Sequence, residues 1–106
     1  MVERYYLFGS TSDDISMVGA SLASALGLEF EARTSSYKGG RYLKLRSDEF
    51  RKLTVEKNWT DDEGYQVEPD FPRHSVLVYV ANPSPNVLTT LETVLALDRL
   101  RMEELE

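Results

Sequence analysis

The sequence has no cysteine, and this absence excludes structural disulfides, thiolate zinc sites and a cysteine nucleophile. It also shows no signal-peptide pattern at its start, because Met1-Val2-Glu3-Arg4 does not lead from a basic into an apolar segment. The uncharged stretch at residues 15–28 is rich in serine, glycine and alanine. It is also shorter than the ~20 apolar residues that cross a bilayer. We therefore expect a cytoplasmic protein that does not bind membranes.

Positive charge is scarce, since the formal net charge is −6. Nucleic-acid binders concentrate lysine and arginine, so this balance argues against direct nucleic-acid binding and permits a partner protein with a basic surface. The charge is unevenly distributed: bases outnumber acids at residues 33–57, and an acidic stretch follows directly. Hydrophobic residues at 42% and charged residues at 28% are typical of a globular protein, and we expect a single domain over residues 1–106.

The first part of the chain predicts a strand followed by a helix. Residues 5–8 are aromatic or apolar and end at Gly9, which indicates a well-buried strand. Residues 10–14 contain serine and threonine, which cap helices, and then two aspartates suited to the positive end of a helix dipole. Apolar side chains recur at helical spacing over residues 15–26, and Gly27 is a natural end of the helix.

The middle of the chain predicts three strands and a surface loop. Residues 28–33 and 42–46 alternate apolar and polar side chains around the turn residues Tyr37-Lys38-Gly39-Gly40, so they predict a β-hairpin. Residues 52–56 alternate again and predict a strand that ends near Trp59. Residues 60–72 are acidic and contain glycine and proline, which favours a loop.

The last part of the chain predicts a central strand and a second helix. Residues 75–81 are almost wholly apolar and β-branched, as in a strand covered on both faces. Ser84 before Pro85 indicates a helix start, and Leu88, Leu91 and Leu95 lie on one helical stripe. Residues 98–106 fit either a continued helix or a short edge strand.

The element order is therefore β-α-β-β-β-β-α, with or without a final edge strand. We predict an α+β fold, a two-layer sandwich in which two helices pack on a mostly antiparallel sheet.

The residues that carry catalytic chemistry elsewhere form no recognisable motif here. His74 is the only histidine, but a catalytic triad also needs a nucleophile and an orienting group, so we predict no catalytic residue. Asp61, Asp62 and Glu63 are consecutive and lack the alternate spacing of a calcium loop, so we predict no metal site and no cofactor. Gly39-Gly40 is not part of a phosphate-binding motif and is interpreted as a hairpin turn.

The acidic segment after residue 58 is the main candidate for partner binding. Aromatic anchors inside a charged rim are typical of protein interfaces, where charges steer association. The predicted contact residues are Trp59, Asp61, Asp62, Glu63, Tyr65, Glu68 and Asp70. The alternative is that Trp59 closes the core at a strand end and the acids only keep an exposed loop soluble.

The outward face of the sheet is a second candidate surface. Its opposite charges are expected mainly to pair across strands. By two-residue periodicity it carries Glu29, Glu31, Arg33, Tyr42, Lys44, Arg46, Lys52 and Glu56.

Two segments carry a family resemblance: ALGLEFEARTSSYKGG at residues 25–40, and EPDFP at residues 68–72 followed by the apolar strand. Through them the chain resembles the small bacterial immunity proteins that accompany polymorphic and contact-dependent toxins. The resemblance implies a cytoplasmic antidote that binds one cognate toxin domain, commonly a nuclease, and blocks its active site or substrate entry. It transfers no binding residue, so the seven contact residues rest on physical reasoning alone.

The first functional hypothesis is a non-catalytic, protein-binding inhibitor that acts by steric and electrostatic occlusion. An alternative is a small-ligand or nucleotide-binding regulatory domain that uses the first strand–helix turn at residues 10–12. The third is a small enzyme that uses His74 with acids from the loop.

Overall fold

The computed structural model describes residues 2–94 and 97–106 of the chain. The strands are β1 (Glu3–Ser10), β2 (Phe30–Ser35), β3 (Gly40–Leu45), β4 (Lys52–Lys57), β5 (Val76–Ala81) and β6 (Asp98–Leu105). The helices are α1 (Ile15–Leu26) and α2 (Pro85–Thr93), and a short 3₁₀ turn, η1, covers Ser36–Lys38. No helix within the described ranges has the length and apolar character needed to cross a membrane.

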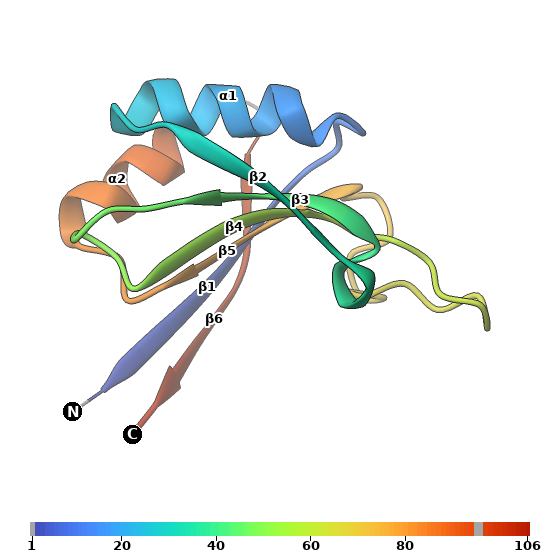
Figure 1. Cartoon of the computed structure of the whole chain (residues 1–106). Helices are drawn as coiled ribbons and strands as arrows, with labels where there is room; N and C mark the ends of the chain where they lie inside the picture. The colour runs from blue at the N-terminus through green and yellow to red at the C-terminus, as the bar shows by residue number, and fades with distance from the viewer. Residues whose placement is uncertain (1, 95–96) are drawn as a thin grey trace.

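Within the described residues, the six strands form one sheet in the order β2-β3-β4-β5-β1-β6, and every neighbouring pair is antiparallel. Both helices contribute buried side chains to the same core, on one face of the sheet (Figure 1). The predicted α+β sandwich is therefore confirmed. Of the two alternatives for residues 98–106, the edge strand is correct, because β6 pairs with β1 at the border of the sheet.

The start of α1 differs from the expectation in one respect. The cap is Asp14, whose Oδ1 accepts the backbone N–H groups of Ser16 and Met17 at 2.9 and 3.2 Å. Ser10 still belongs to β1, and its hydroxyl accepts the N–H of Ser12 in the connecting turn. A carboxylate at this position also meets the positive end of the helix dipole, as expected for the aspartates. Gly27 ends the helix in a left-handed conformation, φ 67°, as predicted.

The second helix begins as predicted. The hydroxyl of Ser84 accepts the N–H of Val87 at 3.2 Å, and Pro85 occupies the first turn, where its missing N–H is no loss. Val87 and Leu91 are buried, and Leu88 packs against the core. Leu95, the last residue of the predicted stripe, lies outside the described residues.

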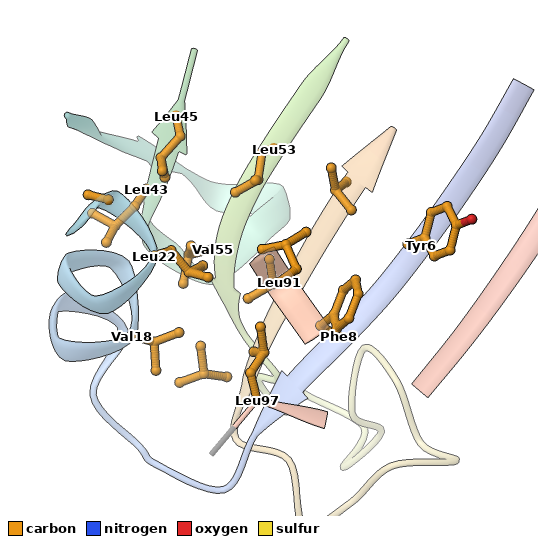
Figure 2. Packing of buried hydrophobic residues seen from close by; sticks show 14 of the residues in the cluster. Tyr6, Phe8, Val18, Leu22, Leu43, Leu45, Leu53, Val55, Leu91 and Leu97 are labelled. Carbon is orange, nitrogen blue, oxygen red and sulfur yellow. The ribbon is translucent and has the colours of Figure 1, made fainter. Parts of the chain in front are cut away.

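The hydrophobic core lies between the helices and the sheet (Figure 2). Strand alternation supplies one layer of it, for example Leu53 and Val55 of β4, and α1 supplies Leu22 from the other side. All three side chains are fully buried. Burial of a side chain of this size stabilises a fold by about 1.5–3 kcal/mol, so this layer is the main source of stability.

The opposite side of the sheet, which we call the open face, has a different composition. It carries most of the charged and tyrosyl side chains that the alternation predicted, as the register places Glu31 opposite Lys44 and Arg33 opposite Tyr42. Glu29 and Arg46 lie just outside β2 and β3. Tyr5, Lys52 and Ala81 share one row of this face, because Ala81 pairs with both Tyr5 and Lys52. The open face is therefore polar and unevenly filled, and the functional candidates lie on it.

Candidate functional site

The segment between β4 and β5 forms the predicted surface loop, and we call residues 59–71 the acidic loop. It extends past the end of the sheet, near η1 (Figure 1). Buried Asn58 holds its base: its Nδ2 donates to the carbonyls of Glu68 and Phe71, and its Oδ1 accepts the N–H of Glu68 at 2.9 Å. One side chain thus joins both arms of the loop. This role of Asn58 could not be predicted, because nothing in the sequence distinguishes it from any other asparagine at the end of a strand.

The tip of the acidic loop is also held by local hydrogen bonds. Asp61 Oδ1 accepts the N–H groups of Glu63 and Tyr65, each at 2.9 Å. Thr60 and Gln66 form an isolated antiparallel bridge across the base of the tip. The carboxylate of Asp61 therefore shapes the turn, as short acidic side chains commonly do.

Five of the predicted contact residues are exposed at the surface of the loop: Asp61, whose carboxylate shapes the turn, and Asp62, Glu63, Tyr65 and Asp70. Asp62, Glu63 and Asp70 make no salt bridge or side-chain hydrogen bond within residues 2–94 and 97–106. Tyr65 is 65% exposed, which is high for an aromatic side chain. This group presents unpaired negative charge and one aromatic ring on an ordered backbone.

Glu68 lies elsewhere, beneath the loop. Its side chain is only 12% exposed, and Arg101 of β6 donates two hydrogen bonds to its carboxylate at 2.9 and 3.2 Å. The hydroxyl of Tyr79 donates to the same carboxylate at 3.3 Å. Burial first, and then the nearby carboxylates of Glu68 and Glu56, raise the pKa of Tyr79. The hydrogen bond from Arg101 to Glu68 likewise raises the pKa of the guanidinium. Glu68 thus joins the loop to the sheet.

Trp59 fixes the loop against the β2–β3 connection. Gly39 has a positive φ of 73°, and a Cβ at this position would overlap the indole ring. Glycine is therefore required there both for conformation and for close approach. The Nε1 atom of Trp59 is buried, and the structure shows no hydrogen-bond partner for it. Trp59, like Glu68, positions the loop from below.

A hollow lies on the open face beside the acidic loop, and we call it the open-face hollow. Its volume is about 460 Å³. We call its strand residues the floor: Tyr5, Tyr6, Lys52, Thr54, Glu56, Tyr79, Val80 and Ala81. We call the other lining residues its walls: Tyr37, Lys38, Arg51 and Val67. The small side chain of Ala81 stands between those of Tyr5 and Lys52, so the depression arises from one short residue in a row of long ones.

The carboxylate of Glu56 joins the floor of the hollow to its wall. It is mostly buried and lies 3.1 Å from the Nζ of Lys38, and the hydroxyl of Thr54 donates to it at 2.6 Å. Lys38 belongs to η1, so this ion pair connects the hairpin turn to β4. Because Trp59 packs on the adjoining Gly39, the turn is held from two directions.

His74 lies just before the start of β5. Its Nε2 is 2.9 Å from Oδ2 of Asp98, and its ring meets that of Phe71 edge-on. The ring also packs against Gly9. Neither His74 nor Asp98 is hydrogen-bonded through its side chain to a serine or threonine hydroxyl in the described part of the chain. Among the described residues, the arrangement therefore contains a histidine and an acid but no positioned hydroxyl nucleophile.

The first strand–helix turn offers little to an anion. The N–H groups of Ser16 and Met17 at the start of α1 already donate to the carboxylate of Asp14, so a phosphate would meet a negative charge there. The consecutive acids of the loop do not converge either. No group of three or more metal-ligating side chains occurs in the described ranges.

No protein-family model, curated protein or solved structure matches the chain. The functional assignment therefore depends on the surface chemistry of this molecule.

Proposed function

We infer that the chain is a non-catalytic protein-binding inhibitor, an immunity protein that neutralises a cognate bacterial toxin by occluding its active site. The supporting observation is the exposed surface of the acidic loop. Asp62, Glu63 and Asp70 have no ion-pair partner in the described residues, and Tyr65 beside them is largely exposed. Unpaired carboxylates around an aromatic anchor are suited to a basic partner surface.

The support for the loop lowers the entropic cost of association. A loop that is ordered before it meets its partner loses less conformational freedom on binding. Asn58 and Asp61 hold the backbone, while Trp59 and Glu68 anchor it to the sheet. In this proposal Asp62, Glu63, Tyr65 and Asp70 touch the toxin, and the four anchoring residues act through them.

A nuclease is the favoured class of toxin. The active-site cleft of a nuclease is basic because it receives a phosphate backbone, so an acidic loop is attracted to it electrostatically. Such attraction accelerates encounter and weakens with salt. The cytoplasm, where a toxin would reach its substrate, is the proposed site of action.

The test is the association rate with the product of the neighbouring gene, measured by stopped-flow fluorescence over a range of salt concentrations. The triple variant Asp62→Lys, Glu63→Lys, Asp70→Lys should slow association at least about tenfold at low salt. The matched control reverses three exposed acids outside the loop, Glu29, Asp48 and Glu106, and has the same net charge. Equal slowing in the two variants, or none in either, would refute the loop as the binding surface.

A further inference from the structure

The open-face hollow has the features of a small-ligand site and is a different surface from the exposed acids of the acidic loop. Its opening lies on the sheet, and Val67 is the only acidic-loop residue in its lining. A volume of about 460 Å³ lies within the range of small-molecule sites, roughly 300–1,000 Å³. The floor and walls come from β1, η1, β4, β5 and the loop, so the hollow exists only in the folded chain.

The charges of the lining favour an anion. Lys38, Arg51 and Lys52 line the hollow, against one carboxylate, Glu56. That carboxylate is already occupied by Lys38 and the hydroxyl of Thr54. Since Lys38 pairs with Glu56 and Arg51 with Glu3, the uncompensated charge of the lining is the positive charge of Lys52. It occurs in a chain whose net charge is −6.

Two of these cations differ in what they already bind. Arg51 lies 3.3 Å from the carboxylate of Glu3 and donates to the hydroxyl of Tyr5 at 2.6 Å. Lys52 makes no ion pair and no side-chain hydrogen bond in the described part of the chain. Lys52 is therefore the group that can neutralise an incoming anion without breaking an existing contact.

The remaining surface favours a flat apolar body. The lining includes the rings of Tyr5, Tyr37 and Tyr79 and the side chains of Val67 and Ala81. Tyr37 is 92% exposed at the rim, and Val67 is 42% exposed, so their contact area is available to a ligand. Arg51 lies 5.4 Å from the centre of the Tyr5 ring and restrains it.

We propose that the open-face hollow binds a small organic anion with an aromatic body, such as an aromatic carboxylate. The ring lies over Ala81 between the tyrosines, and the carboxylate meets the ammonium of Lys52. The ion pairs of Lys38 in η1 and of Arg51 hold these side chains in place, so the site is already formed before a ligand binds. This inference does not depend on a toxin partner, because it concerns a different surface of the molecule.

The test uses three probes of nearly identical shape and different charge: benzoate, benzamide and benzamidinium. Amide proton–nitrogen correlation spectra of the full chain follow each titration. Benzoate should shift the resonances of β4 and β5 around Lys52 and Ala81 with a dissociation constant of about 1 mM, and benzamide should bind about tenfold more weakly. Benzamidinium should bind most weakly of the three.

Two variants and one control locate the binding. Lys52→Gln should weaken benzoate binding about three- to tenfold, and Ala81→Leu should abolish it by filling the floor. Lys44→Gln removes the same charge from the same face outside the hollow and should change nothing. Thermal unfolding of each variant establishes that it is folded, and Lys52→Gln remains informative if Ala81→Leu is not.

Several results would overturn the proposal. A preference for benzamidinium would assign recognition to Glu56 instead of the lysines, and equal binding of benzoate and benzamide would leave only an apolar site. Equal effects of Lys44→Gln and Lys52→Gln would show unspecific attraction of anions. The absence of any benzoate-induced shift at millimolar concentration would exclude the site.

Discussion

The two faces of the sheet differ in how their side chains are held. The helix-covered face is filled by interdigitated apolar groups such as Leu22, Leu53 and Val55, none of which has a directional partner. On the open face, side chains are held by specific polar pairs, among them Lys38 with Glu56 and Arg101 with Glu68. The first arrangement supplies stability through buried area, while the second supplies fixed positions for groups that remain reachable from solvent.

The largest expected effect is a truncation on the covered face. Leu53→Ala should lower the free energy of unfolding by about 2–5 kcal/mol, because it removes buried methyl groups and leaves a cavity. Its neighbour Lys52 points to the open face, and Lys52→Ala should change the same quantity by less than about 0.5 kcal/mol. Urea denaturation at neutral pH measures both. Similar losses of the free energy of unfolding in the two variants would show that the covered face does not contribute more to stability than the open face.

A smaller loss is expected when the buried end of an open-face pair is left without its partner. Arg101→Met should lower the free energy of unfolding by about 1–3 kcal/mol, since the carboxylate of Glu68 stays largely buried. Adding Glu68→Gln to this variant should restore part of the loss. Arg4→Met breaks the exposed pair between β1 and Glu104 of the edge strand β6, and should cost less than about 1 kcal/mol.

Equal losses of the free energy of unfolding in Arg101→Met and Arg4→Met, measured under the same denaturing conditions, would contradict this prediction. That result would mean that the contact between the acidic loop and β6 contributes no more than a surface ion pair.

The smallest effect concerns alkaline pH. The pKa of Tyr79 is raised by burial and by Glu68 and Glu56, so the unfolded chain loses this proton first, near pH 10. The unfolded state then binds fewer protons than the native state, and the free energy of unfolding falls as pH rises above about 10. The slope from this group is at most about 1.4 kcal/mol per pH unit.

Tyr79→Phe should remove that part of the alkaline decline, and Tyr65→Phe, which alters an exposed ring, should retain it. Denaturant titrations at a series of pH values between neutral and strongly alkaline measure the two slopes. A decline in Tyr79→Phe as steep as in the unaltered chain would show that Tyr79 is not responsible.

Local patterns were sufficient to predict most of the fold. The alternation at residues 52–56, the apolar run at 75–81 and the serine–proline pair at 84–85 each identify their element because the relevant contacts are close in sequence. The last strand could not be assigned, because β6 lies at the edge and most of its side chains are exposed. It therefore carries no alternation of apolar and polar residues to read.

The candidate site was predictable only in part, for a related reason. Acidity and aromatic residues made the loop conspicuous, but the position of Glu68 depends on Arg101, which is 33 residues away. The open-face hollow depends on Ala81 lying in register with Tyr5 and Lys52. An alanine in an apolar strand has no distinguishing feature until its neighbours across the sheet are known.

The pairing of β1 with β6 places Glu3 opposite Leu105, so both ends of the described chain meet at one border of the molecule (Figure 1). The acidic loop leads into β5 at Val76, which pairs with Ser10 at the far end of β1. A surface tether, a fluorophore or a fused domain attached to either end would therefore start about 20 Å from the loop, one strand length away. The geometry makes the molecule well suited to immobilisation with its acidic loop facing the solution.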